Sequence, residues 1–466
     1  MAWGRLVFTC LIFACQLGQP AALIAQLGGR PRQPAAERQG FSGAGRQITP
    51  GRNEPVMEMP PAELPADFTP PRPIPEVMTL EKPLLSEAED QAFRQDLLKY
   101  QRALRAGVVN GETKKLIEAG AKWRVYRMSL PEHRRELHKL RDDIVLRDVQ
   151  FASKLDGAPQ AGRELLLEQV TKRASELLDG NFYVRLNAVL LLGQLDLQEE
   201  DTRRGVRQIA YTPAAEVLLP VLTDPKQLTA IKIPTVKGLA RIAEIGQPSL
   251  DLRLRIAQSI VAELQLDNNE LWYRERLVES LGSVGILVDR TPRPFVIQTL
   301  ASIVVDPKEH WLVRTAAAKA IGRLPLNASI NLRLVGYSLV KLGHEMSDAY
   351  NKSPNEWYWN DCFFRLYLAF HHANKAEEDA NLGLLRRTRN LTGNDTIQNA
   401  FNQVLPLIQH VVGSQARTPI AKQNVDAVAQ WLTDNAPQDF KIAPTEDPIL
   451  TDIKAVAEPA KEAASG

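Results

Sequence analysis

The chain has 466 residues, of which 44% are hydrophobic and 24% are charged, and its formal net charge is +2. This composition is typical of a globular protein with a large apolar core, and it excludes a general electrostatic attraction to nucleic acid or to an anionic membrane. The cysteines are Cys10, Cys15 and Cys362, so a chain processed after Cys15 has no disulfide framework and no cysteine-based zinc site.

The first residues have the pattern of an export signal. Arg5 precedes an apolar run from Leu6 to Cys15, and small residues follow as far as Ala25. Because this run is too short to span a bilayer as a helix, we expect residues 1–25 to be a cleaved signal peptide. The protein would then be periplasmic, in the cell envelope or secreted. The alternatives are an uncleaved membrane anchor and a lipoprotein signal, in which "IFAC" would make Cys15 the lipidated residue.

Residues 26–85 are rich in proline, and the clearest piece is "MPPAELPADFTPPRPIPEVM". Proline lacks a backbone donor and has a fixed φ, which rules out a helix or an inner strand. We expect a disordered, extended tether, and a ligand for a proline-binding domain is the alternative. A second disordered segment is predicted at residues 441–466.

Residues 86–160 are predicted to form a helical N-terminal capping region. Ser86 and Glu89 have the spacing of a capping box at the start of a helix. The segment 113–141 has more bases than acids, with aromatic residues interleaved, which is the composition of a polyanion-binding surface or of a solvated helix face. Its candidate partner-binding residues are Trp123, Tyr126 and Arg127.

Residues 161–440 contain a repeat. Four stretches align column by column: "YVRLNAVLLLGQL", "AIKIPTVKGLARI", "WYRERLVESLGSV" and "LVRTAAAKAIGRL". Their third column is basic, with steps of 47, 42 and 40 residues, and consists of Arg185, Lys232, Arg274 and Arg314. Their eleventh column is small and consists of Gly193, Ala240, Gly282 and Gly322. The turn before each stretch contains an acid: Asp179, Asp224, Asp267 and Asp306.

A helix pair that recurs at this period resembles the HEAT repeat family, with armadillo-type repeats as an alternative. The resemblance implies an all-α fold, a HEAT-like α-solenoid superhelix in which stacked neighbours bury each other's apolar faces. It also implies that the basic column and the turn aspartates form a structural ladder between adjacent repeats. A phosphate-binding face lined by the basic column is the alternative.

The small column predicts close contact between helices. Glycine is about 1 kcal/mol worse than alanine inside a helix, so its presence requires a compensating reason. We expect Gly322 to lie where two helices nearly touch, so that Gly322→Leu overpacks the contact while Gly322→Ala is mild.

A second aromatic group lies in "NEWYWNDCFFRLY". Three consecutive aromatic residues, Trp357, Tyr358 and Trp359, cannot all face one helix core. At least one of them is therefore expected at the surface as a partner-binding anchor.

No catalytic or metal-ligating pattern is found. In "GHEMSD", Asp348 stands where a zinc-protease helix requires a second histidine, and Cys362 lies among aromatic residues that favour a buried thiol. We therefore expect no enzyme activity, no metal and no cofactor.

These patterns predict an exported scaffold whose concave surface binds a protein or peptide partner. One alternative is a HEAT-like enzyme or enzyme-associated protein, similar to bilin lyases or helical DNA glycosylases. The other is an envelope protein that binds a polyanion or polysaccharide through residues 113–141. Nucleic acid is not an expected partner, and membrane contact is expected only for an uncleaved or lipidated N-terminus.

Overall fold

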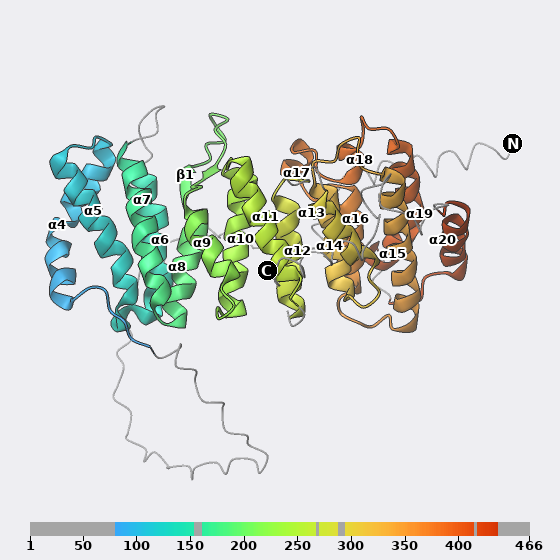
Figure 1. Ribbon diagram of the computed structural model, residues 1–466, viewed down its shortest axis with the longest axis horizontal. Coiled ribbons are helices and arrows are strands. Elements are labelled where there is room, and N and C mark those ends of the chain that lie inside the picture. The colour runs from blue at the N-terminus through green and yellow to red at the C-terminus, as the bar shows by residue number, and fades with distance from the viewer. Residues whose placement is uncertain (1–79, 153–160, 267–269, 288–293, 414–416, 437–466) are drawn as a thin grey trace, which may run out of the picture. The chain divides into compact units, whose positions relative to one another are not determined.

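The computed structural model describes residues 80–152, 161–266, 270–287, 294–413 and 417–436. Within these ranges the chain is all-α, with helix pairs stacked in chain order and one short β-hairpin (Figure 1). The predicted leader, residues 26–79 of the predicted tether, the predicted tail and Asp267 lie outside the described residues.

The N-terminal region begins with α4 (Glu87–Ala106) and α5 (Gly111–Tyr126). The capping box that starts α4 is confirmed, because the Glu89 amide donates to Ser86 Oγ at 3.2 Å while the Ser86 amide donates to the Glu89 carboxylate at 2.9 Å. Four short segments follow: η1 (Arg127–Ser129), η2 (Pro131–Glu136), α6 (Leu137–Asp142) and the π-helix η3 (Asp143–Val149).

Five helix pairs follow, and their second members form an inner row. The outer helices are α7 (Ala161–Glu176), α9 (Ala214–Thr223), α11 (Leu250–Leu264), α13 (Phe295–Val305) and α15 (Leu332–Lys352). The inner helices are α8 (Phe182–Gln194), α10 (Thr229–Ile245), α12 (Leu271–Ser283), α14 (Trp311–Arg323) and α16 (Trp359–Phe370). Each inner helix packs against the next, and so does each outer helix down to α15.

Two details complete the described part. The 3-10 turn η4 (Leu177–Asp179) precedes α8, and an antiparallel hairpin of β1 (Asp196–Gln198) and β2 (Ile209–Ala210) separates α8 from α9. After α16 come the short helices α17 (Lys375–Asp379) and α18 (Leu384–Arg387), then α19 (Asn394–Gly413) and α20 (Lys422–Asp434). Helix α19 packs on α15 and α16, and α20 packs on α15 and α19.

Small residues allow the inner helices to approach each other closely. A Cβ added at Gly193 would lie 3.1 Å from the Cα of Gly238, and one added at Gly282 would lie 2.8 Å from the Cβ of Ala320. A Cβ at Gly322 would overlap the backbone carbonyl of Ala369 on α16. The predicted close contact at Gly322 is confirmed, but the expectation that Gly322→Ala would be mild is wrong, because backbone atoms occupy the space.

Candidate functional site

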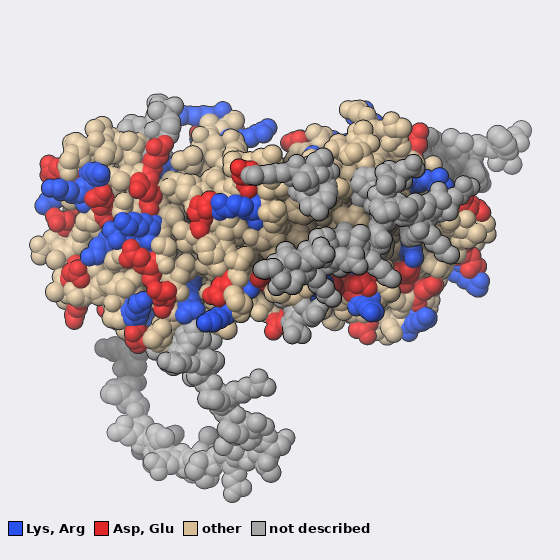
Figure 2. Space-filling view, in the orientation of Figure 1, with Lys and Arg blue, Asp and Glu red and all other residues tan. Residues whose placement is uncertain are grey.

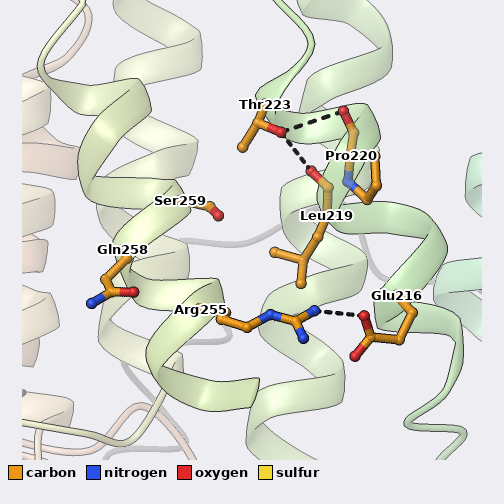
Figure 3. Close-up of a pocket in the computed structure, with 7 residues that line it drawn as sticks. All are labelled: Glu216, Leu219, Pro220, Thr223, Arg255, Gln258 and Ser259. Atoms are coloured by element: carbon orange, nitrogen blue, oxygen red, sulfur yellow. Dashed lines mark hydrogen bonds and ion pairs between the residues drawn. The ribbon is translucent and has the colours of Figure 1, made fainter. Parts of the chain in front are cut away.

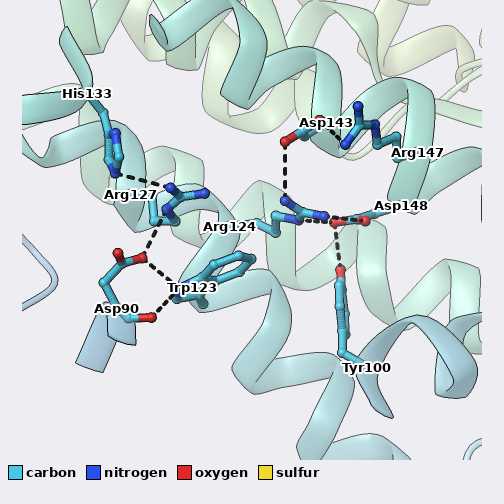
Figure 4. A network of polar contacts seen from close by, with 9 residues as sticks. All are labelled: Asp90, Tyr100, Trp123, Arg124, Arg127, His133, Asp143, Arg147 and Asp148. Atoms are coloured by element: carbon cyan, nitrogen blue, oxygen red, sulfur yellow. Dashed lines mark hydrogen bonds and ion pairs between the residues drawn. The ribbon is translucent and has the colours of Figure 1, made fainter. Parts of the chain in front are cut away.

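The aromatic residues of the basic segment lie in the core and not on a binding surface. Trp123 is buried, and its Nε1 donates to Asp90 Oδ1 at 2.8 Å. Arg127 pairs with the same carboxylate at 2.9 Å, and the buried Tyr126 hydroxyl donates to Glu176. This corrects the interpretation of these three residues as partner contacts, because each is held by another residue of the chain: Trp123 and Arg127 by Asp90 of α4 (Figure 4), and Tyr126 by Glu176 of α7.

A second, buried ion pair, Arg124–Asp148, extends this network. Arg124 Nε donates to Asp148 Oδ2 at 2.7 Å, and the Tyr100 hydroxyl donates to the same oxygen at 3.1 Å (Figure 4). Burial raises the pKa of Asp148, although the Arg124 charge acts in the opposite direction. Every charge drawn in this cluster has an internal partner, so the network is best explained as the polar interior of a capping region.

The basic column does form contacts between repeats, but with glutamates instead of the turn aspartates. Three pairs run from an inner helix to the following unit. They are Lys232–Glu263 at 2.9 Å, Arg274–Glu309 at 2.5 Å and Arg314–Glu345 at 2.5 Å. The bases also donate to backbone carbonyls: Arg185 to Gly180 at 2.9 Å, Arg274 to Leu264 at 2.8 Å and Arg314 to Val304 at 2.9 Å. These contacts are structural, and they leave little of the column exposed for a phosphate.

The turn aspartates have local partners. Asp224 and Asp306 each accept from the backbone amide two residues later, at 2.8 and 2.9 Å. Asp179 pairs with Lys82 at 3.2 Å. The predicted Asp-to-base ladder is therefore corrected at these positions. Asp224 and Asp306 bind their own turns, because a short aspartate reaches its own backbone before it reaches the next repeat, and Asp179 pairs with a lysine outside the basic column.

Ion pairs also join inner helices that are second neighbours. Arg323 on α14 pairs with Glu244 on α10 at 2.9 Å, and Arg365 on α16 pairs with Glu275 on α12 at 2.5 Å. Side chains can meet in this way only where the row of helices bends toward them. Between α10 and α16, the concave side therefore carries at least these two ion pairs of the protein itself.

The consecutive aromatic residues divide between core and surface. Trp359 is only 2% exposed, and its Nε1 donates to the Ser353 carbonyl at 2.8 Å, so its interpretation as a partner contact is corrected. Trp357 is 69% exposed, and its ring meets Tyr358 at a centroid distance of 5.8 Å. Tyr358 is half-buried and packs in turn on Trp359. The exposed indole of Trp357 thus packs on Tyr358, which itself packs on the buried Trp359.

Other aromatic rings lie at the same end of the inner helices. His310 caps α14 by accepting from the Leu312 amide at 3.2 Å, and its ring contacts Tyr358 at 5.1 Å. Trp311 is half-buried against the core, and Trp272, on the first turn of α12, is 46% exposed. We call the group formed by His310, Trp311, Trp357 and Tyr358, together with Trp272 at the same end of α12, the aromatic edge.

The rest of the described surface has weaker candidates for a binding site. A groove of about 370 Å³ between α9 and α11 is bordered by the exposed pair Arg255–Glu216, 2.5 Å apart (Figure 3). Acidic and basic side chains are interspersed over the visible face and do not gather in a patch of one sign (Figure 2).

Within the described ranges, no three His, Cys, Asp or Glu side chains are grouped to hold a metal ion. Cys362 is fully buried, and burial raises the pKa of its thiol to about 12, as expected for a thiol packed in the core. A search of the described helices finds none with the length and apolar character needed to cross a membrane.

No family model matches the sequence, and no curated protein matches it. A crystal structure of a mutant of Kap121p is similar over 76% of this chain and 37% of that one, with 13% sequence identity and a TM-score of 0.30. The chain therefore corresponds to little more than a third of the length of that protein.

Proposed function

We propose that the protein is an exported HEAT-repeat scaffold, without catalytic activity, that binds a protein or peptide partner through the aromatic edge. The observation that carries the proposal is the exposure of Trp357 beside a rigid aromatic base. A tryptophan held in this way loses little conformational entropy on binding, and tryptophan is enriched at the energetic centres of protein interfaces.

The aromatic edge is a better binding surface than the concave side of the inner helices. The ion pairs between second-neighbour helices would have to break before a ligand could enter there, at the cost of leaving charges unpaired. The aromatic edge requires no such rearrangement. Its rings come from the starts of α12, α14 and α16, so one partner could contact three consecutive units.

Peptides selected from a random phage-displayed library on the full chain provide a direct test. Replacing an interface hot spot costs about 2 kcal/mol or more, so Trp357→Ala should weaken the selected peptides roughly 30-fold. The melting temperature should not change, because the replaced side chain is largely exposed.

Leu250→Ala is the matched control. Leu250 is 62% exposed and also lies on the first turn of a helix, but on the outer helix α11. It should bind the selected peptides as the wild type does. If Trp357→Ala binds equally well, the aromatic edge is not the binding surface.

Export is a separate part of the proposal and rests on the leader pattern alone. N-terminal sequencing of the mature protein should begin near Gln26. An intact Met1 on a cytoplasmic product would contradict export, and a lipidated Cys15 would replace the signal peptide by a lipoprotein signal.

A further inference from the structure

A groove of about 430 Å³ lies where α8 ends, between the π-helix η3 and the β-hairpin. We call it the hairpin groove. The aromatic edge lies at the other ends of the inner helices, so an inference about this groove does not rest on the proposed function. We propose that the hairpin groove binds a basic side chain, arginine or lysine, of a peptide in which that residue is flanked by apolar residues.

The floor of the groove is apolar. It is lined by Val145, Leu146 and Val149 of η3 and by Leu195 at the end of α8. Leu146 lies within the π-helix and is 54% exposed. The methylene stem of an arginine or lysine, and the apolar residue beside it, would cover this exposed surface.

The rim of the groove is acidic. Asp142, Glu199 and Glu200 line it, and their side chains remain accessible. Asp142 pairs with Arg141 at 3.6 Å, and Glu199 pairs with Arg163 at 3.5 Å. Glu200 forms no ion pair with any residue that the structure describes. The backbone carbonyls at the end of α8 add partial negative charge beside the rim, and Arg241 donates to one of them, that of Gly193, at 3.3 Å.

Hydrogen bonds and an ion pair join the elements that form the groove, and they hold its rim in place. The buried Arg163 donates to the Val149 carbonyl at 2.6 Å and to the Asp196 carbonyl at 2.7 Å, joining η3 to β1. Arg241 pairs with the Asp196 carboxylate at 2.5 Å. Asp196 is thus neutralised within the wall, and the rim carboxylates through which a ligand would be held are those of Asp142 and Glu200.

Methyl-labelled NMR of the full chain tests the proposal with three probes. The first is the acetylated and amidated pentapeptide Ala-Leu-Arg-Leu-Ala, the second has citrulline in place of arginine, and the third is spermidine. The arginine peptide should shift the methyl signals of Leu146, Val149 and Leu195 to saturation, and its affinity should fall as salt is added. Citrulline keeps the shape without the charge and should bind at least tenfold more weakly.

Variants locate the binding. Asp142→Asn combined with Glu200→Gln should weaken the arginine peptide at least tenfold. Glu112→Gln combined with Asp426→Asn removes two exposed acids elsewhere and should have no effect, and Trp357→Ala should also have none. Since all substituted side chains are accessible, a folding defect is not expected, and melting temperatures check this.

Three results would overturn the inference. They are equal shifts with the citrulline peptide, unchanged affinity in the Asp142 and Glu200 double variant, and no shift of the groove methyl signals with any probe. Spermidine binding as tightly as the arginine peptide would show a site for free polyamines and not for a peptide.

Discussion

Trp357 and Trp359 show what a sequence can and cannot indicate at the scale of a single residue. Three consecutive aromatic residues cannot share one buried stripe, so an exposed member was predictable. Which member is exposed depends on where α16 begins, because Trp359 is its first residue while Trp357 lies before it. Helix starts are the least certain part of a periodic pattern, so the sequence alone could not choose between them.

The same holds for Trp123, Tyr126 and Arg127. Their local composition fits a binding surface, but Asp90 and Glu176, which hold them, lie 33 and 50 residues from Trp123 and Tyr126. Only the packing of α4, α5 and α7 brings these partners together. From the sequence alone, a buried network of charged residues and an exposed basic patch have the same composition. Only the packing of the helices distinguishes them.

Gly322→Ala should destabilise the protein. The added Cβ meets the backbone carbonyl of Ala369, which cannot rotate away as a side chain could. We expect a loss of about 1–3 kcal/mol in the free energy of unfolding, measured by denaturant titration. Gly111→Ala is the control: no atom lies within 4 Å of its added Cβ, so stability should be unchanged or slightly higher. Equal effects at both positions would mean that α16 moves to accommodate the methyl group.

His371 should make stability depend on pH. Burial first, and then the charges of His372 and Arg386, lower its pKa from 6.5 to about 4. A group whose pKa is lower in the folded state stabilises the fold above the unfolded pKa. Its contribution is therefore complete above pH 6.5 and is lost as the pH falls toward 4, by at most about 3 kcal/mol.

His371→Phe tests this dependence. The ring stacks on Tyr367 at 4.8 Å and contacts Phe401 at 4.6 Å, and phenylalanine can keep both contacts. The stability of the wild type relative to this variant should fall between pH 6.5 and 4, as followed by thermal unfolding. A difference that is constant over this range would show that His371 does not titrate.

At the scale of elements, the helix pairs follow directly from the periodicity of the sequence. Small residues at a fixed column predicted the contacts between inner helices, because a helix interior tolerates glycine only for a packing reason. The acidic partners of the basic column were not predictable in the same way. Glu263 and Glu345 lie 31 residues beyond their bases, but Glu309 lies 35 residues beyond its base, so the three glutamates do not share one column of the repeat.

The buried pair between α10 and α11 should be important for stability. Glu263→Gln leaves the Lys232 ammonium buried without a carboxylate, which costs about 3–5 kcal/mol. Adding Lys232→Met should recover part of the loss, because the unpaired charge is then removed. Both values can be read from urea unfolding.

A matched pair on the outer helices gives the comparison. Arg255 and Glu216 also join neighbouring units at 2.5 Å, but both side chains are at least half exposed. Glu216→Gln should therefore cost less than about 1 kcal/mol. If this exposed pair proves as costly as Lys232–Glu263, burial is not what makes the inter-repeat contacts strong.

At the scale of the whole molecule, the repeat units contact mainly their neighbours. A destabilising substitution in one unit should therefore lower stability only in that unit and those beside it. Gly322→Leu should overpack the contact of α14 with α16. Hydrogen exchange should then become faster in residues 294–370 and change little in α4 and α5, because stability in such a stack is a sum of local terms. Faster exchange in every helix would show that the described part unfolds as one cooperative unit.

The ion pairs between second-neighbour helices also limit how the chain can evolve. Where repeats touch only their nearest neighbours, a duplication can insert a unit and disturb nothing beyond the junction. Between α10 and α16 an extra helix pair would carry Arg323 out of reach of Glu244, or Arg365 out of reach of Glu275. An insertion in this stretch therefore costs at least one of these two ion pairs. Insertions and deletions that leave the fold intact belong before α10 or after α16.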